Sequence, residues 1–293
     1  MKVCGVVLSG GESKRFDGDK AFAVVDGEPM VRLVARSLFE SVGYVWLSVK
    51  DERQGEKLME ACTPYVTGYL VDEFSAGPLS GLLTAADKIE ADVFLSCPND
   101  VPRIRSATLK KMLEFLTKET SSAVSIFWAD GSVETLIQAV RKDSIIKYRK
   151  IFLDGRKNLV RASDLLRGCE RALLVYGGNL TDDPFEFSNI NTVDDITHPK
   201  PKALTKGAVR ENIMLSTVRN FSKAVEEYLN GNLFEAGLAY FSESIDFVVR
   251  TILHLGLHAA SDASKMFELA GALEARRLSD NLKEQLKGCT QMR

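Results

Sequence analysis

The chain has 293 residues, of which 45% are hydrophobic and 27% are charged, as is usual for a soluble globular protein of about two domains. A formal net charge of −2 and a pI near 6.0 exclude a general electrostatic attraction to nucleic acid or to anionic membranes. The five cysteines lie singly, without a C-x-x-C pair, which predicts reduced thiols rather than disulfides or a zinc site. We therefore expect a cytoplasmic protein with no nucleic-acid partner and no membrane partner.

Short apolar segments alternate with amphipathic ones over the first two thirds of the chain. Strands are expected at residues 2–8, 44–50, 69–72 and 92–98 and in the stretches SAVSIFWA and VETLIQAV, and helices at 29–42, through Met59, at 77–88 and at 106–116. This βαβ alternation predicts a largely parallel sheet with helices on both faces. Ligands of such sheets bind beyond the carboxyl ends of the strands.

The chain changes character near residue 200. The segment THPKPKALTKG (197–207) holds two prolines and has no apolar period, which is typical of a linker. The residues beyond it have apolar side chains at helical spacing and balanced charge, so we expect a small helical bundle that does not clamp a polyanion. The predicted organisation is a first domain at 1–198, a linker at 199–208 and an all-α domain at 209–293, with dimerisation or docking of an acceptor protein as the expected role of that bundle.

The stretch LSGGESKRFDGDKAF (8–22) directly follows the first expected strand. It is not a Walker A loop, because six residues separate Gly11 from Gly18, and it is not a G-x-G-x-x-G fingerprint, because Gly10 and Gly11 are adjacent. Glycines would nevertheless let backbone amides approach a triphosphate, and Arg15 and Lys20 could neutralise its charge. The loop therefore favours a nucleotide triphosphate site of another kind.

These residues resemble the first motif of the molybdenum cofactor guanylyltransferases, the MobA-like nucleotidyltransferases, which reads L-[AS]-G-G-x-S-x-R-[MF]-G-x-D-K. Leu8 to Phe16 and Asp19-Lys20 match it, whereas Asp17-Gly18 stands where the family has a glycine followed by a variable residue. The resemblance covers residues 1 to about 198. It implies a Rossmann-like, glycosyltransferase A-type nucleotidyltransferase fold, a three-layer αβα sandwich, with the C-terminal helical bundle as an addition.

Three later segments resemble further motifs of the same family, in the same order. VDEFSAGPLSGLLTA (71–85) is similar to the segment that reads guanine, and a carboxylate at Asp72 suits the N1–H and 2-amino donors of that base. LSCPNDVPRI (95–104) resembles a strand-end motif in which Asp100 would hold Mg²⁺. FSNINTVDDI (187–196) resembles a motif whose asparagines face the acceptor or the metal.

The resemblance implies a role for each matching residue. The catalytic residues would be Arg15, Lys20 and Asp100, with Asp100 also the metal ligand, and Asn189 and Asn191 would bind the acceptor. The nucleotide would be bound by Leu8, Ser9, Gly10, Gly11, Ser13, Lys20, Asp72, Gly77, Pro78, Leu79 and Asp100. The implied reaction transfers GMP from GTP to molybdopterin with Mg²⁺ as cofactor and releases pyrophosphate.

Other interpretations stay open at this point. Relatives on the same scaffold use CTP, or use cobinamide phosphate or sugar phosphates as acceptors, and a non-catalytic GTP-binding regulator with a helical output module is also compatible with the sequence. Asp72 and Asp100 are residue types that also cap helices, and Thr192 could cap the helix after the NINT stretch. His254 and His258 lie four residues apart without the carboxylate of H-E-x-x-H, so core packing or a polar helix face is expected there rather than zinc binding.

Overall fold

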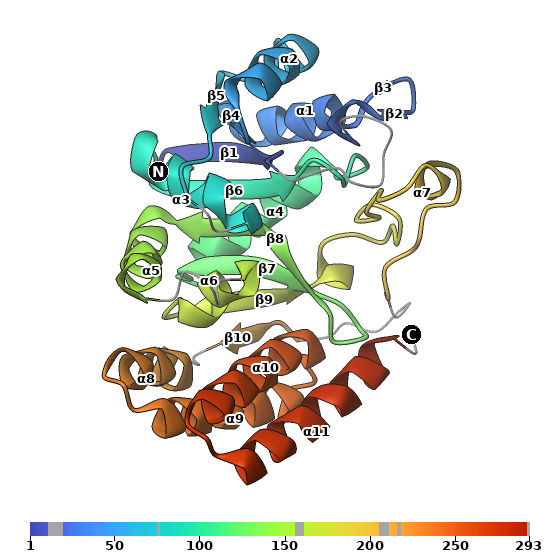
Figure 1. Ribbon diagram of the computed structural model, residues 1–293. Coiled ribbons are helices and arrows are strands. Elements are labelled where there is room, and N and C mark those ends of the chain that lie inside the picture. Colours follow the sequence, from blue (N-terminus) through green and yellow to red (C-terminus); the bar gives the residue numbers. More distant parts are fainter. Residues whose placement is uncertain (11–19, 75–76, 156–160, 205–210, 216–217, 292–293) are drawn as a thin grey trace.

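The computed structural model describes residues 1–10, 20–74, 77–155, 161–204, 211–215 and 218–291. Its centre is an eight-stranded sheet in the order β10-β9-β7-β8-β6-β1-β4-β5 (Figure 1). The strands are β1 (Val3–Leu8), β4 (Val45–Val49), β5 (Gly68–Val71), β6 (Val93–Pro98), β7 (Ala123–Phe127), β8 (Val133–Arg141), β9 (Ala172–Tyr176) and β10 (Ile213–Leu215). A separate hairpin joins β2 (Val24–Val25) to β3 (Glu28–Pro29).

The sheet is mixed rather than uniformly parallel. Neighbours β5, β4, β1 and β6 are parallel, as predicted, and β7 and β9 pair in parallel further along. Strand β8 is antiparallel to both β6 and β7, and β10 is antiparallel to β9. The reversal at β8 follows from a tight hairpin with β7, where Gly131 adopts a φ of 80° that favours glycine.

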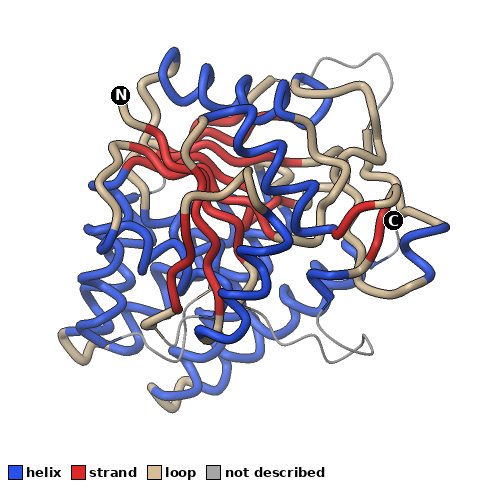
Figure 2. Tube along the Cα trace, turned by 90° about the horizontal axis from the view of Figure 1, so that it is seen from above, coloured by secondary structure: helices blue, strands red, loops and turns tan. Residues whose placement is uncertain are grey.

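Helices cover both faces of the sheet, which gives the expected three layers (Figures 1 and 2). The helices of the first part of the chain are α1 (Met30–Val42), α2 (Glu52–Cys62), α3 (Ser80–Lys88), α4 (Ser106–Lys118), α5 (Lys142–Gly155), α6 (Ala162–Gly168) and the short α7 (Asp194–Thr197). One buried core cluster joins one face of the sheet to Leu38 of α1, Leu58 of α2 and Leu109 of α4. The opposite cluster includes Leu82 of α3 and Leu165 of α6.

The C-terminal region is helical, as predicted. It consists of α8 (Val218–Leu229), α9 (Leu233–Val249), α10 (Leu253–Leu269) and α11 (Leu273–Gln291), which lie side by side below the sheet in Figure 1. Phe221 and Tyr240 from these helices belong to the same buried cluster as Leu165 of α6. Just before them, β10 adds a strand to the sheet. The C-terminal helices therefore share an apolar core with the αβα sandwich, and their expected status as a separate domain stays a prediction.

A fully buried ion-pair network also joins the two parts of the chain. The guanidinium of Arg167 in α6 donates to Asp164 at 2.8 Å, to Glu243 of α9 at 2.6 Å and to Asp262 of α10 at 2.8 Å, and all four side chains are 0% exposed. Arg161 pairs with the second oxygen of Asp262 at 2.7 Å. Because buried charges are tolerated only when they are paired, this network fixes how α9 and α10 meet α6.

Part of the expected linker is tied to the body of the protein. The backbone N–H of Lys202 donates to the carbonyl of Pro184 at 2.7 Å, and the N–H of Ala129 donates to the carbonyl of Ala203 at 3.0 Å.

The surface of α9 carries an exposed apolar face. Its residues Phe234, Leu238, Ile245 and Val249 are each more than 40% exposed and share one side of the helix. Dimerisation or docking of a protein through these helices stays a prediction. No described helix combines the length and apolar character needed to cross a bilayer.

Candidate active site

The carboxyl ends of four parallel strands meet at one edge of the sheet. Leu8, the last residue of β1, lies opposite Ser48 of β4 and Pro98 of β6. The pairing continues one residue further, since Ser9 N–H donates to the Ser48 carbonyl at 2.9 Å and Asn99 N–H donates to the Leu8 carbonyl at 3.2 Å. The residues that follow these strands are therefore brought together, as ligand sites in open α/β sheets require.

Three predicted site residues from distant parts of the chain meet at this edge. The Lys20 ammonium donates to Asp100 Oδ2 at 2.9 Å and to Asn191 Oδ1 at 2.8 Å. The side chains of Lys20 and Asp100 are only 15% and 18% exposed. Such a charge-assisted pair in a partly desolvated position is stronger than a surface ion pair. The cation, the carboxylate and the amide thus form one constellation, which we call the Lys20 cluster.

Asp72 lies beside the first glycine of the opening loop. Its Oδ1 accepts a hydrogen bond from the Ser48 hydroxyl at 2.7 Å, and a Cβ at position 10 would collide with its Oδ2, so a larger residue than Gly10 would displace this carboxylate. Burial raises the pKa of Asp72 to about 6, and the bond from Ser48 opposes that rise. The carboxyl group is therefore poised to gain or lose a proton in mildly acidic solution.

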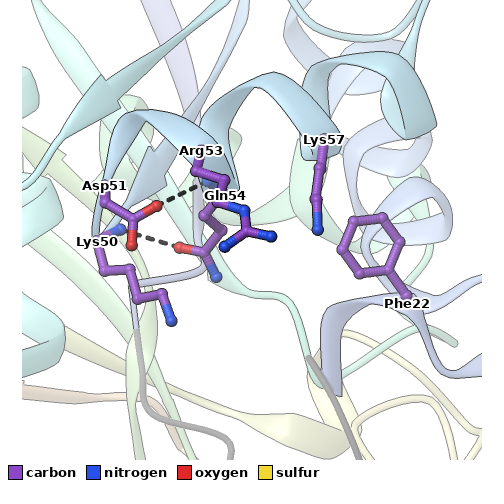
Figure 3. A pocket seen from close by; sticks show the side chains of 6 residues that line it. All are labelled: Phe22, Lys50, Asp51, Arg53, Gln54 and Lys57. Atoms are coloured by element: carbon purple, nitrogen blue, oxygen red, sulfur yellow. Dashed lines mark hydrogen bonds between the residues drawn. The ribbon is translucent and has the colours of Figure 1, made fainter.

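A pocket of about 420 Å³ lies where β4 ends and α2 begins (Figure 3). It is lined by Phe22, Lys50, Asp51, Arg53, Gln54 and Lys57. Gln54 Nε2 donates to the carbonyl of Ser9 at 3.2 Å, which links the pocket wall to the opening loop. Figure 3 shows the nitrogen-bearing ends of Lys50, Arg53 and Lys57 around this space. The pocket is therefore cationic, and it adjoins the predicted nucleotide site.

Local sequence explains how this wall is built. Asp51 caps α2 by accepting the Gln54 N–H at 2.7 Å, so that the helix begins directly after β4. Positions 53 and 57 are one helical turn apart and therefore share a face. None of the residues that line the pocket is among the site residues predicted from the sequence. The available signal was Lys50, a cation at the last position of the strand expected at 44–50.

Not every predicted nucleotide residue exposes a side chain here. Leu8, Ser9 and Leu79 are less than 9% exposed, so only their backbone groups could contact a ligand. Gly77 has a φ of 56° and begins the short 3₁₀ turn η2 (Gly77–Leu79). Gly11, Ser13 and Arg15 lie outside the described residues, as does the side chain of Pro78. Their predicted roles are not tested and stay predictions.

The asparagines predicted to face the acceptor have different surroundings. Asn191 bonds to Lys20, whereas Asn189 Oδ1 is buried without a hydrogen-bond partner among the described residues. The backbone N–H of Ile190, between them, donates to the Asp100 carbonyl at 2.8 Å. The NINT stretch therefore packs directly on the turn that carries Asp100, while its predicted contact with an acceptor remains a prediction.

The residues around Asp100 suit a divalent cation. Asp100 Oδ1 is buried and has no hydrogen-bond partner among the described residues, so one carboxylate oxygen is available as a ligand. No group of three or more His, Cys, Asp or Glu side chains suited to a metal occurs in the described part of the chain. This donor set fits Mg²⁺ in its usual role with nucleotides, in which one or two carboxylates share the ion with substrate phosphates. It does not fit a structural zinc site.

The two histidines of α10, His254 and His258, pack between this helix and the αβα sandwich. Their rings lie 4.5 Å apart. His258 Nδ1 hydrogen-bonds the Ser163 hydroxyl at 2.7 Å, and burial lowers the pKa of His258 to about 3. His254 lies against the backbone of Val133, with 3.1 Å between Nδ1 and the carbonyl oxygen. Both side chains are therefore held in the buried contact between α10, β8 and α6.

Comparison with known proteins agrees with this geometry. Residues 5–161 match the MobA-like NTP transferase domain, a match that ends before the C-terminal helices. A probable molybdenum cofactor guanylyltransferase of Bacillus licheniformis is 27% identical over 206 residues, covering 69% of this chain and 98% of the relative. One of Bacillus subtilis is 28% identical, covering 67% of this chain and 94% of that relative.

A solved structure has the same fold. Molybdopterin-guanine dinucleotide biosynthesis protein A from Archaeoglobus fulgidus superposes with a TM-score of 0.54 at 19% identity, covering 68% of this chain and 96% of the other. The family match spans more than half of the chain, and it includes the strands and loops that carry Lys20, Asp72 and Asp100. The chain therefore belongs to the MobA-like NTP transferase family and is a nucleotidyltransferase.

Proposed function

We propose that this enzyme transfers GMP from GTP to the terminal phosphate of a molybdopterin-type acceptor, with Mg²⁺, and releases pyrophosphate. The observation that carries the proposal is the Lys20 cluster. In it a cation and a carboxylate lie side by side at the edge of the sheet where Asp72 also lies. Family membership supplies the reaction class, and homologues named molybdenum cofactor guanylyltransferase support the choice of GTP.

The chemistry around Asp72 supports guanine as the base. Guanine carries hydrogen-bond donors at N1 and at the 2-amino group, which an ionised carboxylate accepts. It also carries acceptors at O6 and N7, for which lysine and arginine are the usual protein partners. Asp72 offers the carboxylate, and Lys50 and Arg53 offer cationic donors in the adjoining pocket. Cytosine and adenine lack the two adjacent donors, at N1 and at the 2-amino group, that one carboxylate can accept together.

The phosphate chemistry requires positioning and charge neutralisation. An oxygen of the acceptor phosphate attacks the α-phosphorus of GTP, the bond from that phosphorus to the bridging oxygen breaks, and pyrophosphate leaves with the electron pair. The acceptor oxygen is already anionic, so no general base is needed. Lys20 would hold the phosphates, with Arg15 of the opening loop, and would neutralise the charge that develops on the leaving group. Asn191, bonded to Lys20, is near enough to orient that ammonium.

Asp100 is the residue that would hold the metal. When bound, Mg²⁺ supplies charge neutralisation on the triphosphate oxygens and fixes their orientation. The buried Oδ1 of Asp100, which has no hydrogen-bond partner within the described part of the chain, is the oxygen offered to it. The other carboxylate oxygen stays on Lys20, which keeps the ammonium beside the phosphates.

A pyrophosphate-release assay tests the proposal. GTP, CTP, ATP and UTP are compared with Mg²⁺, each with and without molybdopterin. The proposal expects release with GTP only when molybdopterin is present. Release with CTP would assign a different nucleotide to the enzyme, and release with GTP and another phosphate acceptor, such as cobinamide phosphate, would assign a different acceptor. Binding of GTP without release under any condition would instead indicate a regulatory protein.

A further inference from the structure

Asp195 is a buried carboxylate in the loop behind the Lys20 cluster, and no role in the reaction has been assigned to it above. Its residue is 3% exposed. One oxygen, Oδ2, accepts three hydrogen bonds: from the backbone N–H of Asn191 at 2.9 Å, from the N–H of Thr192 at 2.8 Å and from the Thr192 hydroxyl at 2.9 Å. The other oxygen pairs with Lys200 at 3.3 Å. Every strong interaction of this carboxylate is thus with the loop that carries Asn191 or with the segment that follows it.

The contacts of the loop lead from Asp195 to the reacting groups. The backbone of Asn191 is held by Asp195, and the side chain of Asn191 accepts the Lys20 ammonium at 2.8 Å. The neighbouring Ile190 N–H is bonded to the carbonyl of Asp100. Since a buried carboxylate with three donors is difficult to displace, it holds the backbone of this loop in one conformation. The orientation of Asn191 toward Lys20 depends on that conformation.

Thr192 and Asp195 form a capping box at the start of α7, in which the Thr192 hydroxyl accepts the Asp195 N–H at 3.4 Å and the Asp195 carboxylate accepts the Thr192 N–H at 2.8 Å. This box does not account for the further bond from the Asn191 N–H. Helix α7 has only four residues. Asp195 lies inside α7 and bonds to donors before the helix, at Asn191 and Thr192. Its neighbour Asp194 points elsewhere, since its side chain is 76% exposed and pairs with His198 at 2.9 Å. The two adjacent aspartates therefore have different functions, one in the loop and one on the surface.

From these contacts we infer that Asp195 is a positioning residue for phosphate transfer, which acts by holding Asn191 against Lys20 at the Asp100 turn. The inference rests on the proposed function for its catalytic consequence, but its structural part does not. The carboxylate of Asp195 bonds to Asn191, Thr192 and Lys200, so it would act on the reaction through Asn191 rather than by contact with the substrate. Its removal should lower turnover while the affinity for GTP, which depends on Asp72 and the pocket, stays nearly unchanged.

Two variants separate the charge from the hydrogen bonds. Asp195→Ala removes the acceptor and leaves two backbone N–H groups without their partner, so turnover should fall at least about tenfold with less than about a threefold change in KM for GTP. Asp195→Asn keeps a carbonyl oxygen in nearly the same place and should retain most of the activity. Asp194→Ala is the matched control, since it changes the exposed neighbour and should leave turnover within about twofold.

A double-mutant cycle gives the decisive comparison. If Asp195 acts by placing Asn191, the effect of Asp195→Ala should nearly vanish in an Asn191→Ala background, because the group that it positions is gone. Additive effects of the two substitutions would overturn the inference and leave Asp195 a stabilising residue only. Thermal melting of all four proteins checks that each is folded at the assay temperature.

Amide hydrogen exchange tests the structural part without any assay of activity. Exchange at Asn191 and Thr192 should accelerate at least about tenfold in Asp195→Ala and little in Asp194→Ala. Unchanged protection of both amides in Asp195→Ala would contradict the inference even if turnover fell. Faster exchange in a protein that shows no pyrophosphate release with any nucleotide would instead contradict the proposed function and leave the role of Asp195 in the loop intact.

Discussion

Lys20 and Asp100 are 80 positions apart in the chain, yet the ammonium of one lies 2.9 Å from a carboxylate oxygen of the other. Lys20 begins the short 3₁₀ turn η1 (Lys20–Phe22) after the opening loop, and Asp100 follows β6. The parallel pairing of β1 with β6 brings these two segments to the same edge of the sheet. The other oxygen of Asp100 is buried without a described partner, so a single carboxylate can serve both a fixed cation and a metal ion.

The first prediction concerns Asp100. Asp100→Asn keeps the shape of the side chain but removes the charge that would hold Mg²⁺ and pair with Lys20. Pyrophosphate release should fall by about 100-fold to 1,000-fold, the usual loss when a main electrostatic contact of a transition state is removed. Circular dichroism and a thermal melt should show a folded protein. Retained turnover in a folded Asp100→Asn variant would rule out the metal assignment.

The second prediction concerns the charge of Lys20. Lys20→Ala should reduce turnover by about 100-fold or more, because the leaving pyrophosphate loses its fixed cation. Lys20→Arg should recover only part of the activity, since a planar guanidinium does not reproduce the point charge held by Asp100 and Asn191. The measurement is steady-state kinetics with saturating GTP. Equal turnover in the alanine variant and the parent protein would remove Lys20 from the mechanism.

The third prediction is a pH dependence of nucleotide affinity. In the proposed function only the ionised form of Asp72 would accept the N1–H and 2-amino donors of guanine, and burial raises the pKa of this group to about 6. Below pH 6 the KM for GTP should therefore rise by up to about tenfold per pH unit, whereas an Asp72→Asn variant should have a high KM that does not change between pH 5 and 7. A wild-type KM that is constant over this range would contradict the role of Asp72.

The same pKa makes a prediction about stability. The pKa of Asp72 is higher in the folded protein than in the unfolded chain, so its stabilising contribution is complete below about pH 4 and is lost as the pH rises through 6. At pH 7 Asp72→Asn should therefore raise the free energy of unfolding by about 1–2 kcal/mol, a range reduced for solvent screening. Urea denaturation at pH 7 and at pH 4 checks the sign, because the gain should disappear at the lower pH.

The fourth prediction concerns the buried network that joins the C-terminal helices to α6. Arg167→Met leaves three buried carboxylates without their main partner and should lower the free energy of unfolding by about 3–5 kcal/mol. Arg277→Ala is the control, since the pair of Arg277 with Glu274 lies on the surface and should contribute less than about 1 kcal/mol. Equal denaturation midpoints for the two variants would show that the network does not stabilise the protein.

Much of the fold follows from local sequence. The expected helix at 29–42 corresponds to α1, and the strand at 92–98 corresponds to β6, because long apolar runs and a clear 3.6-residue period leave few alternatives. The direction of β8 was not predictable in the same way. Two adjacent strands can form a hairpin or a crossover, and the Asp130–Gly131 turn that decides between them is short.

The site was predictable only where a motif carried it. Lys20, Asp72 and Asp100 each stand in a segment that resembles a family motif, and the structure brings Lys20 and Asp100 into contact. The cationic pocket was not predictable because Arg53 and Lys57 look like ordinary residues of a solvated helix until the structure places α2 against the opening loop, where Gln54 bonds to the carbonyl of Ser9. Asp195 was missed for a similar reason. Asp195 follows Thr192 at the spacing of a capping box, but only the three-dimensional contacts show that its carboxylate also holds the backbone of Asn191.

The most direct test of the central claim follows the transferred group itself. The protein is incubated with Mg²⁺, molybdopterin and GTP labelled at the α-phosphorus, with Asp100→Asn as a control in parallel. The account predicts that label appears in a molybdopterin product at the same rate as pyrophosphate is released, and that the Asp100→Asn variant forms almost none. Pyrophosphate release with the label recovered only as free GMP, or no label in any product, would contradict nucleotidyl transfer to this acceptor.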